Sequence, residues 1–138
     1  MNEHEFKART KQFALDIVDF VSQLPKDRQA DVLARQLLRS GTSVGANYRS
    51  ATRAQSVAHM VSKLAIVEEE ADESGYWLEL ILEAGIVPPG HQAVRGLQRE
   101  ASEIVGVTVA SKKTVRARDR TIAGPRSKIE NRESEASR

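Results

Sequence analysis

The chain has 138 residues, a length that fits one domain and can bury a core without covalent crosslinks. It contains no cysteine, which excludes disulfides and thiolate metal sites. The formal net charge is only +2, so the chain as a whole is not a polycation, and the placement of its charges is more informative than their sum.

The charges are segregated along the sequence. Cations prevail in residues 26–53, all charged side chains in residues 68–83 are carboxylates, and cations prevail again in residues 112–120. A chain patterned in this way can pair its own segments, or it can present surfaces of opposite charge to partners.

No targeting or membrane segment is expected. The first ten residues are largely charged or polar and lead into an amphipathic pattern, with no secretory hydrophobic region. No apolar run reaches the length that spans a bilayer. We therefore expect a soluble, cytoplasmic protein that does not bind a membrane.

Apolar residues recur at helical spacing from about residue 5 to residue 24, which predicts a first helix. Pro25 ends it, because the residue before a proline is disfavoured in the helical region. The stripe expected to face the core consists of Phe6, Thr10, Phe13, Ile17, Phe20 and Leu24.

A second helix is predicted to begin near Lys26 or Asp27, with Asp27 as its N-cap. Gly41 and Gly45 fall inside this helix, and each costs about 1 kcal/mol relative to alanine in a helix interior. Either the helix is weak or kinked there, or a neighbouring backbone approaches closely. Its core stripe is expected to be Leu33, Leu37, Ser40, Val44, Asn47 and Ala51.

The third helix has the strongest pattern and is expected to end at Gly85 and the Pro88-Pro89-Gly90 turn. A helix that is apolar on more than one side often contacts more than one partner. We therefore expect the second stripe of this helix to form an interface, with a second subunit as one candidate. That stripe consists of Ile66, Trp77 and Leu80, and the core stripe of Val57, Met60, Val61, Leu64, Val67, Ala71, Ser74, Leu78 and Ile81.

The fourth helix is expected to fray beyond Thr114, and residues 119–138, which hold few apolar side chains, are predicted to be a disordered tail. The helical domain would then span residues 1–118. Four helices with short connections predict an all-α fold, an antiparallel up-down-up-down four-helix bundle. The core stripe of the fourth helix is expected to be Val94, Leu97, Ala101, Ile104, Val105 and Thr108.

Several short motifs occur along helices two, three and four. They are Gln36-Leu37-Leu38-Arg39-Ser40, then Ser43-Val44 with Asn47 and Arg53, then Glu69-Glu70-Ala71-Asp72-Glu73-Ser74-Gly75-Tyr76-Trp77-Leu78-Glu79-Leu80, and Val109-Ala110-Ser111-Lys112-Lys113-Thr114. With these motifs the chain resembles, over roughly residues 24–118, the bacterial four-helix bundle family of 23S rRNA intervening-sequence proteins. Members usually carry proline where this chain has Gly45, and proline would fix a kink that glycine only permits.

The resemblance implies an antiparallel four-helix bundle that often assembles into a ring of five. Some members are encoded inside insertions in large-subunit ribosomal RNA genes. A similar bundle is the accessory protein of diversity-generating retroelements, where it binds nucleic acid and a reverse transcriptase. The partners implied for this chain are therefore further copies of itself, RNA or DNA, and a reverse transcriptase or another protein.

The acidic run on the third helix raises the question of a metal site, because Glu69 and Glu73 share one helix face. Di-iron bundles also need a Glu-x-x-His motif on each of two helices. No histidine here lies three residues after a carboxylate, so we expect no metal and no cofactor. The histidines are His4, His59 and His91.

The same carboxylates are expected to form ion pairs between helices two and three. Such pairs contribute little net stability, and we infer that they fix the register of the two helices. The predicted carboxylates are Glu69, Glu70 and Glu73, and the predicted cations are Arg35, Arg39 and Arg53.

Cations crowd the end of the fourth helix, where they could neutralise phosphates of a nucleic acid. The alternative is a solvated helix end, where cations also suit the negative end of the helix dipole. A ring of five would repeat the cluster and favour binding through avidity. No aromatic residues are interleaved for base stacking, so contact would be with the backbone. The candidate residues are Arg49, Lys112, Lys113, Arg116, Arg118 and Arg120.

Enzyme signatures are missing from the sequence. There is no glycine-rich phosphate loop followed by lysine, and no serine has an identifiable histidine base with an orienting acid. The leading hypothesis is a non-enzymatic protein that associates with nucleic acid, structured RNA above all. The alternatives are a protein–protein scaffold or accessory subunit and, third, a metal-dependent enzyme.

Overall fold

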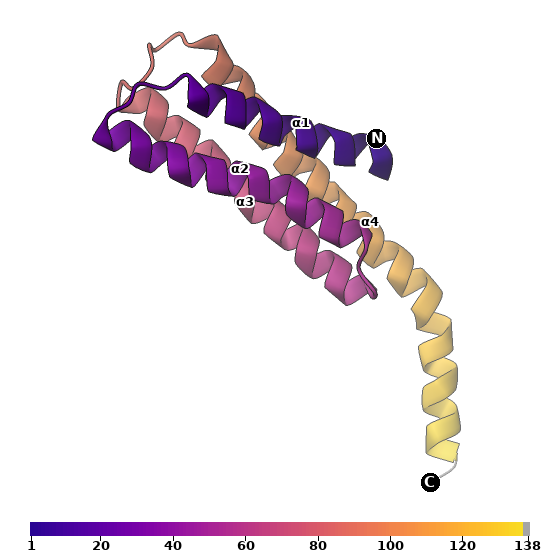
Figure 1. The fold of residues 1–138 in the computed structure, drawn as a ribbon. Helices are drawn as coiled ribbons and strands as arrows, with labels where there is room; N and C mark the ends of the chain where they lie inside the picture. The colour runs from indigo at the N-terminus through magenta and orange to yellow at the C-terminus, as the bar shows by residue number, and fades with distance from the viewer. Residues whose placement is uncertain (137–138) are drawn as a thin grey trace.

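The computed structural model describes the backbone of residues 1–136 and the side chains of residues 1–120. Four helices follow one another: α1 (Glu3–Ser22), α2 (Arg28–Thr52), α3 (Val57–Glu83) and α4 (Gln92–Ala136). Figure 1 shows them side by side as an elongated bundle, from which the last part of α4 projects. Among the described residues there is no β-strand, so the predicted all-α fold is confirmed.

Local chemistry accounts for most of the helix ends. The side chains of Asn2, Asp27 and Ser56 each accept a hydrogen bond from the backbone N–H three residues later, which caps α1, α2 and α3. Gly85 follows the end of α3 with a φ of 74°, a conformation that favours glycine. The prediction of Asp27 as the cap of α2 is confirmed.

Contacts between helices fix their relative directions. Along α1 and α2, Gly41 approaches Ile17 while Gly45 approaches Thr10, so the residue number rises on one helix as it falls on the other. The remaining neighbours, α2 with α3 and α3 with α4, pack closely and are joined by short connections, which makes successive helices antiparallel. The bundle therefore has the up-down-up-down arrangement.

The core follows most of the predicted stripes, whereas Leu33, Val57, Met60, Val61 and Val105 are only half-buried. All six residues of the first stripe are buried, and Leu64, Ile81 and Ile104 are fully buried on the later helices. The pattern missed Tyr48, which is buried because its ring packs edge-on against Phe6 with the ring centroids 4.7 Å apart. Asn47, expected in the core stripe of α2, is half-buried and bonds to the Ser43 carbonyl of its own helix.

The two glycines of α2 lie at a close approach of α1, and the helix runs unbroken through both. A Cβ on Gly41 would lie 2.3 Å from Cδ1 of Ile17, and one on Gly45 would lie 3.3 Å from the carbonyl oxygen of Thr10. Of the two interpretations left open by the sequence, the structure favours close packing over a break.

The fourth helix is longer than expected. It continues to Ala136, whereas the sequence predicted fraying beyond Thr114 and disorder from residue 119. Within residues 1–120, Val115 is the last residue packed against the core, and residues 116–120 are exposed. Alanine, arginine, lysine and glutamate are frequent after Val115, and all four residue types have a high helix propensity. The domain boundary after residue 118 stays a prediction, and residues 137–138 lie outside the description.

Replacing Gly41 with alanine is expected to destabilise the protein. Inserting a methyl group into a filled core costs about 1–3 kcal/mol, which outweighs the gain of about 1 kcal/mol in helix propensity. Gly106→Ala is the matched control, because a Cβ there meets nothing within 4 Å. Urea unfolding should show a lower midpoint for G41A and a higher midpoint for G106A. An unchanged midpoint for G41A would contradict close packing at this position.

Candidate nucleic-acid interface

Exposed cations from three helices gather at one end of the bundle, where α1 begins, α2 ends and α4 leaves the core. The carboxylates in these segments are few: Glu3, Glu5 and Asp119. We call this surface the basic end. Its exposed cations are Lys7, Lys11, Arg49, Arg53, Lys113, Arg116, Arg118 and Arg120.

Most of the predicted nucleic-acid-binding residues are exposed at the basic end. Lys113, Arg116 and Arg120 follow one another at helical spacing, so they share one face of α4. Arg118 lies on another side, at the rim of a cavity of about 590 Å³ that also touches α1, α2 and α3. None of these four, nor Arg49, forms an ion pair with another described residue.

Lys112 differs from the other predicted cations. Its Nζ lies 3.0 Å from a carboxylate oxygen of Glu68 on α3, and its side chain is only 15% exposed. The lysine therefore links α4 to α3, and its charge is already balanced by a carboxylate. The sequence could not separate Lys112 from Lys113, because only the packing of α3 beside α4 shows which of the two is covered.

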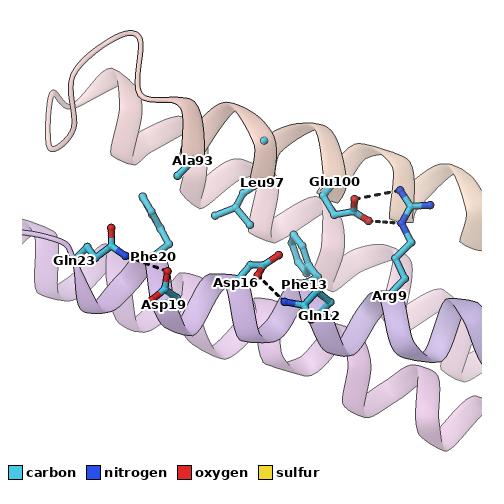
Figure 2. Close-up of a pocket in the computed structure, with 11 residues that line it drawn as sticks. Arg9, Gln12, Phe13, Asp16, Asp19, Phe20, Gln23, Ala93, Leu97 and Glu100 are labelled. Carbon is cyan, nitrogen blue, oxygen red and sulfur yellow. Dashed lines mark hydrogen bonds and ion pairs between the residues drawn. The ribbon is translucent and has the colours of Figure 1, made fainter.

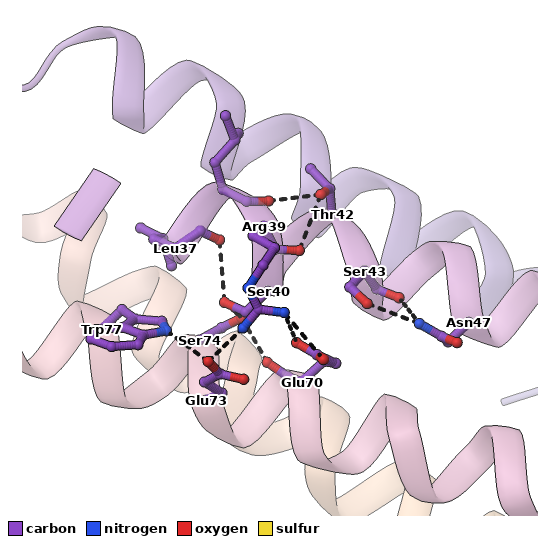
Figure 3. Close-up of polar contacts among 11 residues, drawn as sticks. Leu37, Arg39, Ser40, Thr42, Ser43, Asn47, Glu70, Glu73, Ser74 and Trp77 are labelled. Carbon is purple, nitrogen blue, oxygen red and sulfur yellow. Dashed lines mark hydrogen bonds and ion pairs between the residues drawn. The ribbon is translucent and has the colours of Figure 1, made fainter. Parts of the chain in front are cut away.

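The ion pairs predicted between helices two and three centre on Arg39. Its guanidinium lies 3.3 Å from Glu70 and 2.5 Å from Glu73, and the hydrogen bond with Glu73 raises the pKa of Arg39. Figure 3 shows the arginine between the two carboxylates, with the Trp77 indole N–H also donating to Glu73. Three residues predicted to join this cluster, Arg35, Arg53 and Glu69, form no ion pair with another described residue.

A buried pair of serines lies beside this cluster. Ser40 on α2 and Ser74 on α3 are fully buried, with their hydroxyl oxygens 2.8 Å apart. Each hydroxyl also lies within hydrogen-bond distance of a backbone carbonyl of its own helix, Ser40 of Leu37 and Ser74 of Glu70, so either serine can donate in the bond between the two hydroxyls. This directional contact allows one register between α2 and α3, which reinforces the ion pairs outside it (Figure 3).

Arg9 was not predicted from the sequence, although it is the main polar link between α1 and α4. Its Nε lies 2.5 Å from Glu100, and it also pairs with Glu103. The hydrogen bond with Glu100 raises the pKa of Arg9. Figure 2 shows this pair at one end of a cavity of about 440 Å³ between α1 and α4, floored by Phe13, Phe20 and Leu97.

The residues predicted to form an interface lie on α3 and are half-buried. Ile66, Trp77 and Leu80 keep part of their surface accessible, and Trp77 also packs against the core. The neighbouring Tyr76 is 52% exposed, with its ring centroid 5.2 Å from that of Trp77. The outer side of α3 therefore offers apolar surface among its carboxylates.

The carboxylates and histidines were also candidates for a metal site. No group of three or more histidine, cysteine, aspartate or glutamate side chains in the described part is placed to hold a metal ion. No helix in the same part is long and apolar enough to cross a bilayer.

Comparison with known proteins agrees with this architecture. A family model described as the 23S rRNA-intervening sequence protein matches residues 2–109. The chain belongs to this family. The match to the 23S rRNA-intervening sequence proteins covers α1, α2, α3 and the part of α4 up to Val109, and it ends just before Lys112 and the later cations of α4.

A solved structure supports the same assignment. It is the crystal structure of a protein with unknown function from the S23 ribosomal protein family of Bacteroides thetaiotaomicron. The two chains are 34% identical, with a TM-score of 0.75, and the similarity covers 82% of this chain and 99% of the other. No curated protein matches the chain.

Replacing Arg9 with methionine should test the link between α1 and α4. The pair is partly exposed, so its loss is expected to lower the free energy of unfolding by about 0.2–1 kcal/mol, and the effect should shrink as salt screens the charges. Arg99→Met is the control, because Arg99 is exposed and forms no ion pair within residues 1–120. Urea unfolding at low and high salt measures both variants, and a loss that does not depend on salt would contradict an electrostatic link.

Proposed function

We propose that this protein is a non-enzymatic nucleic-acid-associated bundle, and that structured RNA binds through phosphate contacts at the basic end. One observation carries the proposal: exposed cations from α1, α2 and α4 come together at one end, while the carboxylates of residues 68–83 lie along α3. A surface of this kind releases condensed counterions when it binds a polynucleotide, which favours association and makes it depend on salt.

The basic end is expected to contact the backbone and not the bases. Sequence-tolerant stacking needs exposed aromatic rings beside the cations. The aromatic rings nearest this end, Phe6 and Tyr48, are buried against each other in the core. Recognition would therefore depend on the spacing of phosphates, which a folded RNA sets by its shape.

A homo-oligomer would strengthen such binding. The resemblance to the family implies a ring of five, which would repeat the basic end and convert weak phosphate contacts into avidity. The part of Ile66, Trp77 and Leu80 that remains accessible is the contact that we propose between subunits. These residues lie on α3, whereas the cations of the basic end lie on the other three helices, so assembly through α3 leaves the basic end accessible.

The decisive measurement is an equilibrium titration of labelled structured RNA, duplex DNA and single strands at roughly 50 mM and roughly 200 mM salt. We expect tightest binding to structured RNA and a steep decrease with salt. Replacing Arg49, Lys113, Arg116 and Arg118 with alanine should weaken binding. It should also reduce the salt slope by about 0.7–0.9 for each phosphate that the variant no longer neutralises.

The matched control removes the same charge from the opposite end of the bundle. Its four alanine substitutions are at Lys26, Arg28, Arg35 and Arg99, all exposed and without an ion pair to another described residue. The control should bind like the parent protein. Equal weakening by both variants would mean that net charge alone decides binding, and no binding at low salt would favour a protein–protein scaffold.

The oligomer is tested separately by molar mass from light scattering. Ile66→Glu combined with Leu80→Glu should yield a smaller species, because burying two carboxylates at a subunit contact is costly. Leu15→Glu is the control, since Leu15 on α1 is 53% exposed and lies outside the proposed contact. Circular dichroism checks that the helices are retained, and an unchanged mass for the double variant would exclude this contact.

A further inference from the structure

A groove on the outer side of the α1–α2 pair is lined by three cations and no carboxylate. Lys7 and Lys11 come from α1, Arg49 comes from α2, and the cavity between them has a volume of about 280 Å³. We call it the α1–α2 groove. Its other lining residues are small or neutral: Ala14, Thr42, Gly45 and Ala46.

The packing of the two helices determines where the cations lie. The Phe6 and Tyr48 rings are in edge-on contact, which brings the turns that carry Lys7 and Arg49 to the same level. One turn further along α1, the position of a Cβ on Gly45 would lie 3.6 Å from the backbone nitrogen of Lys11. All three cations are thus carried by closely packed turns of α1 and α2, so the packing of the two helices places them around one groove.

The positive charge of the groove is uncompensated by its surroundings. Residues 6–15 of α1 and residues 32–52 of α2 contain no aspartate or glutamate. Glu3, the carboxylate one turn before Lys7, lines the separate cavity at the end of the bundle. Two lysines four residues apart on a helix repel each other, and an anion placed between them would relieve that repulsion.

The floor of the groove lets a ligand approach closely. Ala14 and Ala46 contribute only methyl groups to the lining, and Thr42 lies beside them. A phosphate group could therefore enter between the three cationic side chains, which supply ammonium and guanidinium donors from both sides.

We propose that the α1–α2 groove binds a backbone phosphate of the polynucleotide, as a second contact surface beside the cations of α4. This inference rests on the proposed function. It deepens that function, because it assigns one phosphate contact of the basic end to a single site formed by Lys7, Lys11 and Arg49. The occupant is a phosphodiester of a nucleic acid chain.

Lysine acetylation footprinting with mass spectrometry tests this inference residue by residue. The full chain is treated with an acetylating reagent alone, with structured RNA, and with inorganic phosphate at the same concentration of phosphate groups. We expect RNA to protect Lys7 and Lys11 in the groove and Lys113 on α4. Lys26, which is exposed at the opposite end, should react equally in all three samples.

The outcomes separate the two proposals. Protection of Lys113 with full reactivity of Lys7 and Lys11 would overturn the groove and leave the proposed function intact. Protection of Lys7 and Lys11 without protection of Lys113 would support the groove as a binding site and exclude α4 from the interface. Full reactivity of all three lysines in the presence of RNA would reject both the groove and the proposed function. Equal protection of the groove lysines by inorganic phosphate would assign the groove to a free anion and overturn a polynucleotide ligand.

A charge-reversed pair supplies an independent readout. Lys7→Glu with Lys11→Glu should weaken binding of structured RNA at least roughly tenfold at low salt, because two side chains that attract the phosphate would then repel it. Lys26→Glu with Arg28→Glu changes the net charge by the same amount and should bind like the parent. Equal affinity of the two double variants would contradict the inference.

Discussion

The close packing of α1 on α2 is the contact on which the rest of this molecule depends. Gly41 and Gly45 remove two side chains from the surface of α2, so the Ile17 side chain packs against Gly41 and the α1 backbone at Thr10 approaches Gly45. Dispersion and burial at this seam stabilise α1, which otherwise has only sparse packing against α4. The same seam brings Lys7 and Lys11 beside Arg49 and so creates the α1–α2 groove.

Polar contacts between helices determine register more than stability. Arg39 links α2 to α3, Lys112 links α3 to α4, and Arg9 links α4 to α1. Each pair is at least partly accessible to solvent, where an ion pair contributes little free energy. A shift of one helix by a turn would separate the partners and would also bury unpaired charge. The contacts thus select one arrangement from the several that a helical apolar stripe allows.

Charge is distributed unevenly around the finished bundle. The helix α3 carries the carboxylates of residues 68–83, and part of this charge is balanced internally by Arg39 and Lys112. The cations of the basic end have no such partners among the described residues. Pairing within the bundle therefore neutralises part of the negative charge on α3 and leaves the cations of the basic end available to a ligand. The basic end is thus strongly positive, although the whole chain has a net charge of only +2.

The sequence by itself determined the four helices, the Asp27 cap, the buried stripes and the family, because capping, periodicity and motif spacing are local properties. The sequence placed the end of α4 near Thr114, because apolar residues become rare there, whereas the helix in the structure continues to Ala136. Only the tertiary structure decided that Gly41 marks a close approach, that Arg9 binds Glu100, and that Lys112 is neutralised. A periodic pattern tells which face of a helix turns inward, but the neighbour that covers each flank depends on packing between segments far apart in the chain. For the same reason the cations of α1 and α2 become one groove only when the two helices meet.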